Sequence, residues 1–90
     1  MEKIILITGA TDGIGLETAK LLASKGQRLL LHGRNAKKLN EVQKVISGIS
    51  GAATPEVFQA DLSNLAEVSA LADSVCAKHA KLDILINNAG

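Results

Sequence analysis

The segment from Thr8 to Gly15, Thr-Gly-Ala-Thr-Asp-Gly-Ile-Gly, combines the residue types and spacing in this chain that best suit chemistry. It follows the apolar run Ile4–Ile7 and leads into an amphipathic stretch. A strand, a glycine-rich turn and a helix in this order favour anion binding, because N–H groups at a helix start lack intrahelical partners and the helix dipole adds partial positive charge there. Glycines let the chain turn sharply and let a phosphate approach the backbone without meeting a Cβ. We therefore interpret the turn as a phosphate site, and specifically as one for a dinucleotide.

Hydrophobic patterning divides the chain into alternating strands and helices. Continuous apolar runs indicate buried strands, and apolar residues at helical spacing indicate amphipathic helices. The expected strands are Lys3–Thr8, Gln27–Gly33, Val57–Ala60 and Leu82–Ile86, and the expected helices are Ile14–Lys25, the stretch after Asn35 to Ser47, and the stretch after Asn64 to about His79. Gly26 is placed to end the first helix and Asn35 to begin the second. Asn64 and Glu67 have the spacing of a capping box at the start of the third.

Each helix is expected to bury one apolar face. These faces comprise Ile14, Ala19, Leu22 and Ala23 in the first helix, Leu39, Val42, Val45 and Ile46 in the second, and Leu65, Val68, Leu71, Ala72 and Val75 in the third. Cys76, beside the last face, is expected to be a small packed residue.

The alternation of elements predicts an α/β fold, the N-terminal portion of a doubly wound parallel sheet. Right-handed β-α-β units give the strand order 3-2-1-4, with a switch point between strands 1 and 4. The glycine turn ends strand 1 and Asn87–Gly90 ends strand 4, so both segments would meet at one crevice. Ligands bind outside the carboxyl ends of the strands at such a switch point.

Composition excludes several classes of function. The 90 residues make one domain at most, and 10 basic against 9 acidic residues leave a net charge of +1. Without a basic cluster, and with Phe58 as the single aromatic residue, nucleic acid is not an expected partner. No apolar run approaches the roughly 20 residues of a membrane span, and Met1 leads almost directly into a strand, so we expect a cytoplasmic protein. His32 and His79 have no partner at ligand spacing, so no metal site is expected.

The glycine spacing Gly-x-x-x-Gly-x-Gly and the ending Asn-Asn-Ala-Gly together resemble the short-chain dehydrogenase/reductase family. The stretch Thr-Gly-Ala-Thr-Asp-Gly-Ile-Gly-Leu-Glu-Thr-Ala is similar, more narrowly, to retinol-dehydrogenase-like and hydroxysteroid-dehydrogenase-like members. The resemblance runs from about residue 3 to the last residue. It implies a Rossmann fold and, in the complete enzyme, hydride transfer between NAD(P)(H) and an alcohol or carbonyl substrate.

The resemblance also implies which residues hold the cofactor. Backbone amides of the Thr8–Gly15 turn would hold the pyrophosphate and the adenosine ribose, with Ile14 on the nicotinamide side. Asp61-Leu62 would meet the adenine, and Asn87–Gly90 would line the cofactor. The implied cofactor-binding residues are Thr8, Gly9, Thr11, Asp12, Gly13, Ile14, Gly15, Arg34, Asn35, Asp61, Leu62, Asn87, Asn88, Ala89 and Gly90. None of these positions is catalytic.

The end of the second strand bears on the choice of cofactor. An acidic residue there would bind the ribose hydroxyls of NAD, but the sequence is His-Gly-Arg-Asn, with Arg34 in place of a carboxylate. A guanidinium suits a phosphate because its fixed fork donates two hydrogen bonds. We therefore predict NADP rather than NAD. Asp12 argues against this choice, since many NADP-preferring relatives carry a basic residue near that place.

Simpler structural roles remain open for several of these residues. The glycines could serve helix–strand packing, and Arg34 could be a solvated charge. Asp61 could cap the following helix, although Asn64 is the better cap. Asn87 and Asn88 could bond to neighbouring strands, alone or in addition to lining the cofactor.

The family's reaction requires a serine and a Tyr-x-x-x-Lys pair, and this chain contains no tyrosine. We expect the 90 residues to be the first part of a longer oxidoreductase and to be inactive alone. The alternative is a non-enzymatic NADP-binding module or an inactive truncated product, and the coding sequence after Gly90 would distinguish them. Without a fifth strand, Ile84 and Ile86 would lie on an unpaired edge, which favours association. The substrate, and whether the complete enzyme is a homo-oligomer, are left open.

Overall fold

The computed structural model describes residues 3–11, 13–49, 51–78, 82–86 and 88. The elements alternate as predicted: β1 (Ile4–Ile7), α1 (Gly13–Ser24), β2 (Arg28–Gly33), α2 (Ala36–Ser47), β3 (Glu56–Gln59), α3 (Leu65–Lys78) and β4 (Ile84–Ile86). His79, to which the third helix was expected to extend, lies outside the described residues.

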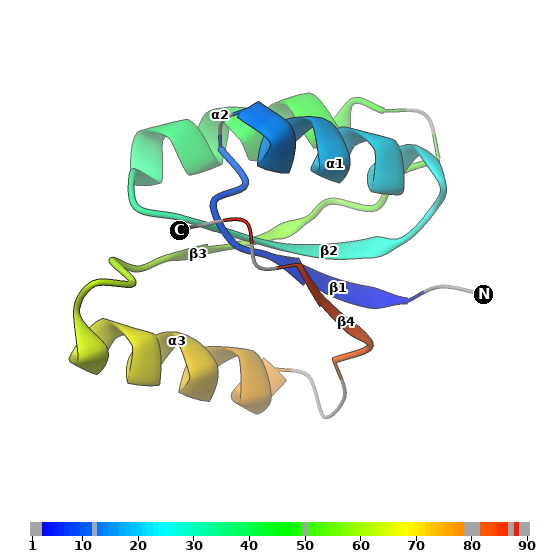
Figure 1. Cartoon of the computed structure of the whole chain (residues 1–90). Coiled ribbons are helices and arrows are strands. Elements are labelled where there is room, and N and C mark those ends of the chain that lie inside the picture. Colours follow the sequence, from blue (N-terminus) through cyan, green and yellow to red (C-terminus); the bar gives the residue numbers. More distant parts are fainter. Residues whose placement is uncertain (1–2, 12, 50, 79–81, 87, 89–90) are drawn as a thin grey trace.

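The strands form one parallel sheet in the order β3-β2-β1-β4, which confirms the predicted topology. β1 is central, pairing Leu6 with Leu30 of β2 and with Leu85 of β4. Helices α1 and α2 cover one face of the sheet and α3 lies on the other (Figure 1). The glycine turn and Asn88 therefore follow neighbouring strands at the carboxyl edge of the sheet.

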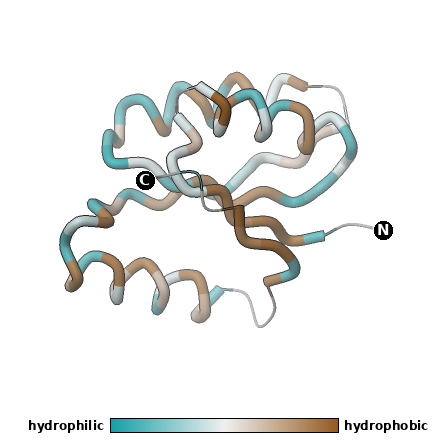
Figure 2. The backbone as a smooth tube through the Cα atoms, viewed as in Figure 1, coloured by the Kyte–Doolittle hydropathy of each residue, from teal (hydrophilic) through white to brown (hydrophobic). Residues whose placement is uncertain are grey.

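Successive residues of β1 and β2 contribute to two separate cores, because side chains of a strand alternate between faces. The core with α1 and α2 consists of Ile5, Ile7, Ala10, Ala19, Ala23, Leu29, Leu31, Leu39, Val42 and Ile46. Among the residues that the structure describes, the buried members of the core on the α3 side are Leu6, Leu30, Phe58 and Val75. The central strand β1 is continuously hydrophobic, whereas hydrophobic and hydrophilic residues alternate along the helices (Figure 2).

Ile14 and Val45, which were expected on the buried faces of α1 and α2, are exposed instead. Ile14 is 78% exposed, because it lies in the first turn of α1, at the carboxyl edge of the sheet. Val45 is 54% exposed and lines a groove between α1 and α2 with Leu16. Helical spacing identified the correct faces of α1 and α2, but each predicted face extends beyond the part of the helix that the sheet covers.

The helix α3 is present as predicted, but its predicted buried face was largely wrong. Val75 is buried and Leu71 partly buried, but Leu65 is 84% and Val68 36% exposed, and Ala72 is exposed. Cys76, expected to be packed, is also exposed. Among the described residues, the small cluster on this face of the sheet offers these side chains little to pack against.

The helix caps are mostly as predicted. Gly26 has a positive φ of 79° at the end of α1, and the Asn35 side chain accepts a hydrogen bond from Lys38 N at the start of α2. Asn64 Oδ1 accepts from Ala66 N at 2.9 Å at the start of α3. The expected capping box is not closed, because the Glu67 carboxylate accepts from the backbone N–H of Asp61 instead.

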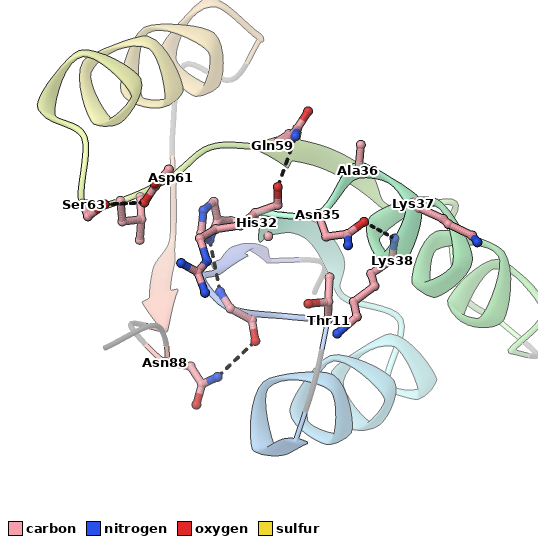
Figure 3. A pocket seen from close by; sticks show the side chains of 14 residues that line it. Thr11, His32, Asn35, Ala36, Lys37, Lys38, Gln59, Asp61, Ser63 and Asn88 are labelled. Atoms are coloured by element: carbon pink, nitrogen blue, oxygen red, sulfur yellow. Dashed lines mark hydrogen bonds between the residues drawn. The ribbon is translucent and has the colours of Figure 1, made fainter.

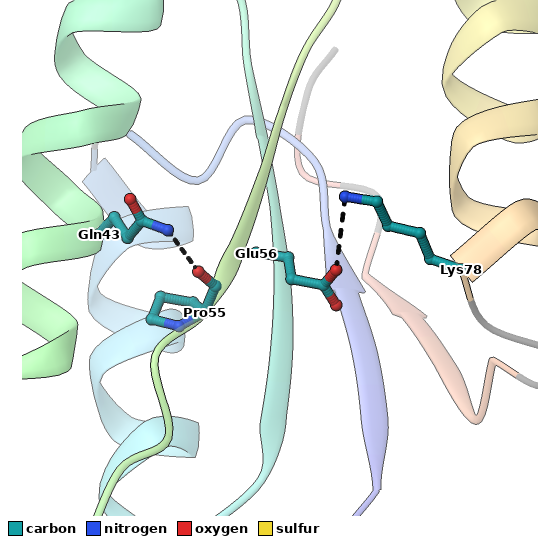
Figure 4. Close-up of polar contacts among 4 residues, drawn as sticks. All are labelled: Gln43, Pro55, Glu56 and Lys78. Atoms are coloured by element: carbon teal, nitrogen blue, oxygen red, sulfur yellow. Dashed lines mark hydrogen bonds and ion pairs between the residues drawn. The ribbon is translucent and has the colours of Figure 1, made fainter.

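β3 is attached to helices on both faces of the sheet (Figure 4). Gln43 of α2 donates from Nε2 to the Pro55 carbonyl at 2.7 Å. On the opposite face Lys78 of α3 lies 3.8 Å from the Glu56 carboxylate and 5.6 Å from the centre of the Phe58 ring. These contacts attach the start of β3 to α2 and α3.

Within the described part of the chain, no helix is both long and apolar enough to cross a membrane. The same residues contain no group of three or more His, Cys, Asp or Glu side chains placed to hold a metal ion.

Candidate functional site

An open cavity of about 1250 Å³ lies outside the carboxyl ends of the strands. Its lining comes from the glycine turn, the end of β2 with the start of α2, the loop after β3, and the residue after β4 (Figure 3). The described lining residues are Gly9, Thr11, His32, Gly33, Arg34, Asn35, Ala36, Lys37, Lys38, Gln59, Asp61, Leu62, Ser63 and Asn88. The cavity is at the switch point where the topology predicts a ligand.

Thr8 joins the ends of β1 and β4 beneath this cavity. Its backbone N–H donates to the Ile86 carbonyl at 3.0 Å, and its Oγ1 accepts from Asn88 N at 2.9 Å. The Asn88 side-chain amide donates to the Gly9 carbonyl at 3.1 Å. Thr8 is only 6% exposed, so its side chain is committed to holding the two segments together. A direct contact between Thr8 and a cofactor stays a prediction.

The glycines of the turn meet different physical requirements. Gly9 and Gly13 have positive φ values of 62° and 56°, which favour glycine. A Cβ added at Gly15 would overlap the Gly9 carbonyl oxygen and lie 2.6 Å from Asn88 Nδ2, so this position requires glycine. A Cβ on Gly13 would instead meet open space. Gly15 therefore allows close packing of α1 against the turn, whereas the surroundings of Gly13 leave room for a ligand.

Several backbone amides of the turn are already bonded within the protein. Gly9 N donates to the His32 ring at 3.1 Å, and Ala10 N donates to the His32 carbonyl at 2.9 Å. The amides of the first turn of α1, from Gly13 to Gly15, have no acceptor within their own helix. The amides at the start of α1 are therefore the better candidates for binding a phosphate.

His32 is a lining residue to which the sequence analysis gave no role. Its side chain is buried, 1% exposed, and its Nε2 lies 2.7 Å from the Ala60 carbonyl oxygen. The available signal was a histidine directly after the apolar run Leu29–Leu31 in the strand Arg-Leu-Leu-Leu-His-Gly. That pattern does not identify the segments that the side chain joins.

The wall after β2 is cationic. Arg34 is exposed, and its backbone carbonyl accepts a hydrogen bond from Gln59 Nε2 at 3.1 Å. Lys37 and Lys38 also line the cavity. Among the described lining residues Asp61 alone is a carboxylate.

Ser63 holds the Asp61 carboxylate through two hydrogen bonds. The carboxylate accepts from Ser63 Oγ at 2.7 Å and from Ser63 N at 2.9 Å. These two bonds, and to a smaller extent the Arg34 charge, hold the pKa of Asp61 below its usual range. Asn64 caps α3 in its place, so Asp61 organises a turn at the cavity rather than the helix start.

The structure thus brings together part of the predicted site. Gly9, Thr11, Arg34, Asn35, Asp61, Leu62 and Asn88 line the cavity, whereas Thr8, Gly13, Ile14 and Gly15 do not belong to its lining. Asp12, Asn87, Ala89 and Gly90 lie outside the described residues. Cofactor contact by any of these residues stays a prediction.

Comparison with known proteins gives the family. Residues 3–90 match the family model described as short chain dehydrogenase. The chain is 41% identical over 92 aligned positions to (-)-isopiperitenone reductase of Mentha piperita, covering 100% of this chain and 29% of that protein. It is 38% identical over 89 positions to dehydrogenase/reductase SDR family member 7B of Mus musculus, covering 97% of this chain and 28% of that protein. The chain belongs to the short-chain dehydrogenase/reductase family.

Solved structures of family members have the same fold. A metagenomic short-chain oxidoreductase in complex with NADP superposes with a TM-score of 0.88 at 38% identity, over 98% of this chain and 39% of that one. An NADPH dependent reductase involved in bacilysin biosynthesis superposes with a TM-score of 0.92 at 26% identity, over 100% of this chain and 38% of that one. The 90 residues have the Rossmann fold of this family, and they span less than a third of the length of the two curated relatives.

Proposed function

We propose that this chain is the NADP-binding N-terminal portion of a short-chain dehydrogenase/reductase that interconverts an alcohol and a carbonyl compound. The observation that carries the choice of NADP is Arg34, exposed at the cavity directly after β2, where no carboxylate stands. A carboxylate at that place would repel a 2′-phosphate, whereas a guanidinium binds one through two parallel N–H groups. The NADP bound to one of the similar solved structures supports this choice.

The described residues fit a dinucleotide in three respects. The start of α1 offers backbone amides beside Gly13, where a side chain is absent and the space is open. Arg34, with Lys37 and Lys38 beside it, supplies positive charge for the adenosine phosphate. Asp61 and Leu62 lie on the lining contributed by the loop after β3 and would meet the adenine.

When bound, the nicotinamide supplies or accepts the hydride. What these 90 residues contribute is binding: the turn and α1 orient the phosphates, and the wall after β2 selects the adenosine end. The family's proton donor is a tyrosine, and the sequence has none. Proton transfer to the substrate therefore falls to residues beyond those of this chain, and the chain alone is expected to be inactive.

Isothermal titration calorimetry of the 90-residue chain with NADP and with NAD tests the proposal. NADP should bind more tightly than NAD, and Arg34→Ala should remove that difference by weakening NADP about tenfold or more, the scale of a lost charged hydrogen bond. Arg28→Ala, at the opposite end of the same strand, is the matched loss of an arginine and should leave both affinities unchanged. Equal affinity of the unsubstituted chain for NADP and NAD would contradict the choice of NADP.

A further inference from the structure

We infer that His32 is the positioning residue of the phosphate-binding turn: a neutral imidazole that fixes the Gly9 amide and, through it, the start of α1. This inference rests on the proposed function, because it assigns His32 to the binding of a dinucleotide. His32 contacts the turn and not the phosphate, so it acts through its neighbours.

The two hydrogen-bond partners of His32 define its ring. Gly9 N–H can only donate, and it meets Nδ1 at 3.1 Å. The Ala60 carbonyl can only accept, and it lies 2.7 Å from Nε2. Both bonds form together only in the neutral ring that carries its hydrogen on Nε2. From its place on β2 (Figure 3), the ring therefore bonds to the turn after β1 and to the loop after β3.

The backbone of β2 reinforces this bridge. The His32 carbonyl accepts from Ala10 N at 2.9 Å, and the next carbonyl, of Gly33, accepts from Ala60 N at 3.1 Å. Two consecutive amides of the turn thus bond to one residue, the first to its side chain and the second to its main chain. The side-chain bond is the one that a substitution can remove without altering the strand.

The Gly9 residue transmits this restraint to α1. Gly9 holds a positive φ of 62°, and its carbonyl accepts from Asn88 Nδ2 at 3.1 Å. The same carbonyl oxygen is where a Cβ on Gly15 would collide, so Gly9 and α1 are in close contact. Gly9 N–H belongs to the Thr8–Gly9 peptide and the Gly9 carbonyl to the next one, so rotation about the Gly9 backbone would move the carbonyl against which α1 packs. The first-turn amides of α1, which are the proposed phosphate donors, are therefore set by the same residue whose N–H His32 holds.

Neither packing alone nor metal binding accounts for this arrangement. An apolar residue of similar size would fill the space but would leave the Gly9 N–H and the Ala60 carbonyl without these partners, and such losses are costly in a buried position. A metal ligand needs a free ring nitrogen, whereas both nitrogens of His32 are engaged by backbone groups. The geometry suits a spacer between two backbone segments.

Three substitutions separate the two bonds. In His32→Asn, the Asn Oδ1 reaches the place of Nδ1 and can accept from Gly9 N–H. In His32→Gln, the longer amide reaches the place of Nε2 and can donate to Ala60. His32→Leu removes both bonds but keeps an apolar side chain. If His32 acts through Gly9, the Asn variant should behave like the unsubstituted chain and the other two should not.

The first measurement is hydrogen exchange of the Gly9 amide by NMR in the ligand-free chain, and the second is NADP affinity by calorimetry. In the Gln and Leu variants the Gly9 amide should exchange about tenfold faster or more, and NADP affinity should fall about tenfold, the scale of one lost hydrogen bond in a buried position. In the Asn variant both should stay within about threefold of the original values. The melting temperature of each variant, measured in parallel, separates local from global loss.

Two results would overturn the inference. One is a Gln variant that retains both slow Gly9 exchange and NADP affinity. The other is equal loss in all three variants in step with the melting temperature, which would make His32 a general structural residue. Failure of the unsubstituted chain to bind NADP would overturn the proposed function, while the Gly9 exchange rates would still decide whether His32 holds the turn.

Discussion

The side-chain amide of Asn88 donates a hydrogen bond to the carbonyl of Gly9 at 3.1 Å, across a sequence separation of 79 residues. The bond links the residue after β4 to the first glycine of the turn after β1. It acts on the same residue whose N–H is held by His32. Gly9 is thus fixed at its carbonyl by one neighbouring strand end and at its N–H by the other.

Loss of the Asn88 side chain should lower stability modestly. Asn88→Ala removes the bond to Gly9 but keeps the backbone bond from Asn88 N to Thr8 Oγ1. We expect the free energy of unfolding to fall by about 0.5–1.5 kcal/mol, the usual net contribution of one hydrogen bond. Urea unfolding followed by circular dichroism measures this change. Asn40→Ala, on the exposed side of α2, is the control and should not lower stability, because alanine favours helix.

Gly15→Ala should disturb the contact between α1 and the turn. The added Cβ would collide with the Gly9 carbonyl oxygen, which is backbone held in place by Asn88, so the helix must shift. Overpacking of this kind costs about 1–3 kcal/mol, and the free energy of unfolding should fall by that amount. The shift should also weaken NADP binding, measured by calorimetry.

Gly48→Ala is the matched control for this substitution. Gly48 ends α2 with a φ of −81°, and a Cβ there would lie 3.5 Å from the Val45 carbonyl, an ordinary contact. We expect its unfolding free energy to stay within about 0.5 kcal/mol of the original. A Gly15 variant as stable as the Gly48 variant would contradict the close approach described for α1.

The sheet was predictable from sequence because its signal is local and redundant. Continuous apolar runs marked the strands, and the right-handed crossover rule reduced the possible orders to the observed 3-2-1-4. The meeting of the glycine turn with the residue after β4 followed from that order alone. Gly26 and Asn35 were recognisable because a left-handed end and an amide cap require particular residue types.

What sequence could not supply was the surroundings of a side chain. The spacing of Leu65 and Val68 defined an apolar face, but exposure depends on what the opposite layer provides. Likewise, the Asn64 N–H, which a capping box would offer to Glu67, donates to the Asp61 carbonyl, and the Glu67 carboxylate accepts from Asp61 N instead. His32 gave no signal beyond polarity, since its partners come from two other segments.

Ser63→Ala should raise the pKa of the Asp61 carboxyl group toward its usual value. The hydroxyl bond from Ser63 is the largest cause of the lowering, followed by the Ser63 backbone bond, with Arg34 smaller. Because folding lowers this pKa, the ionised carboxylate stabilises the folded chain at pH values above the ordinary pKa of an aspartate. That stabilisation is lost as the pH falls through the lowered pKa of the folded state. NMR titration of the Asp61 carboxyl carbon measures the shift directly.

Two companion variants sharpen this titration. Arg34→Ala should raise the same pKa by less than Ser63→Ala, since the Arg34 charge is the smaller cause. Ser24→Ala, whose hydroxyl donates to Leu21 at the far end of α1, should leave it unchanged. An Asp61 pKa that does not respond to Ser63→Ala would contradict the bonding described for this turn.

Leu85→Lys should reduce self-association of the 90-residue chain. Within the described sheet β4 is an edge strand, paired with β1 alone, and Leu85 on it is 57% exposed. An exposed apolar edge strand favours pairing with another chain, and a lysine on the edge opposes it. Leu21 on α1 is 58% exposed, so Leu21→Lys is a control of matched exposure away from any edge. Sedimentation velocity across a concentration series should show a shift toward monomer for Leu85→Lys and none for Leu21→Lys. Equal effects of the two substitutions would mean that general hydrophobicity, and not the β4 edge, drives association.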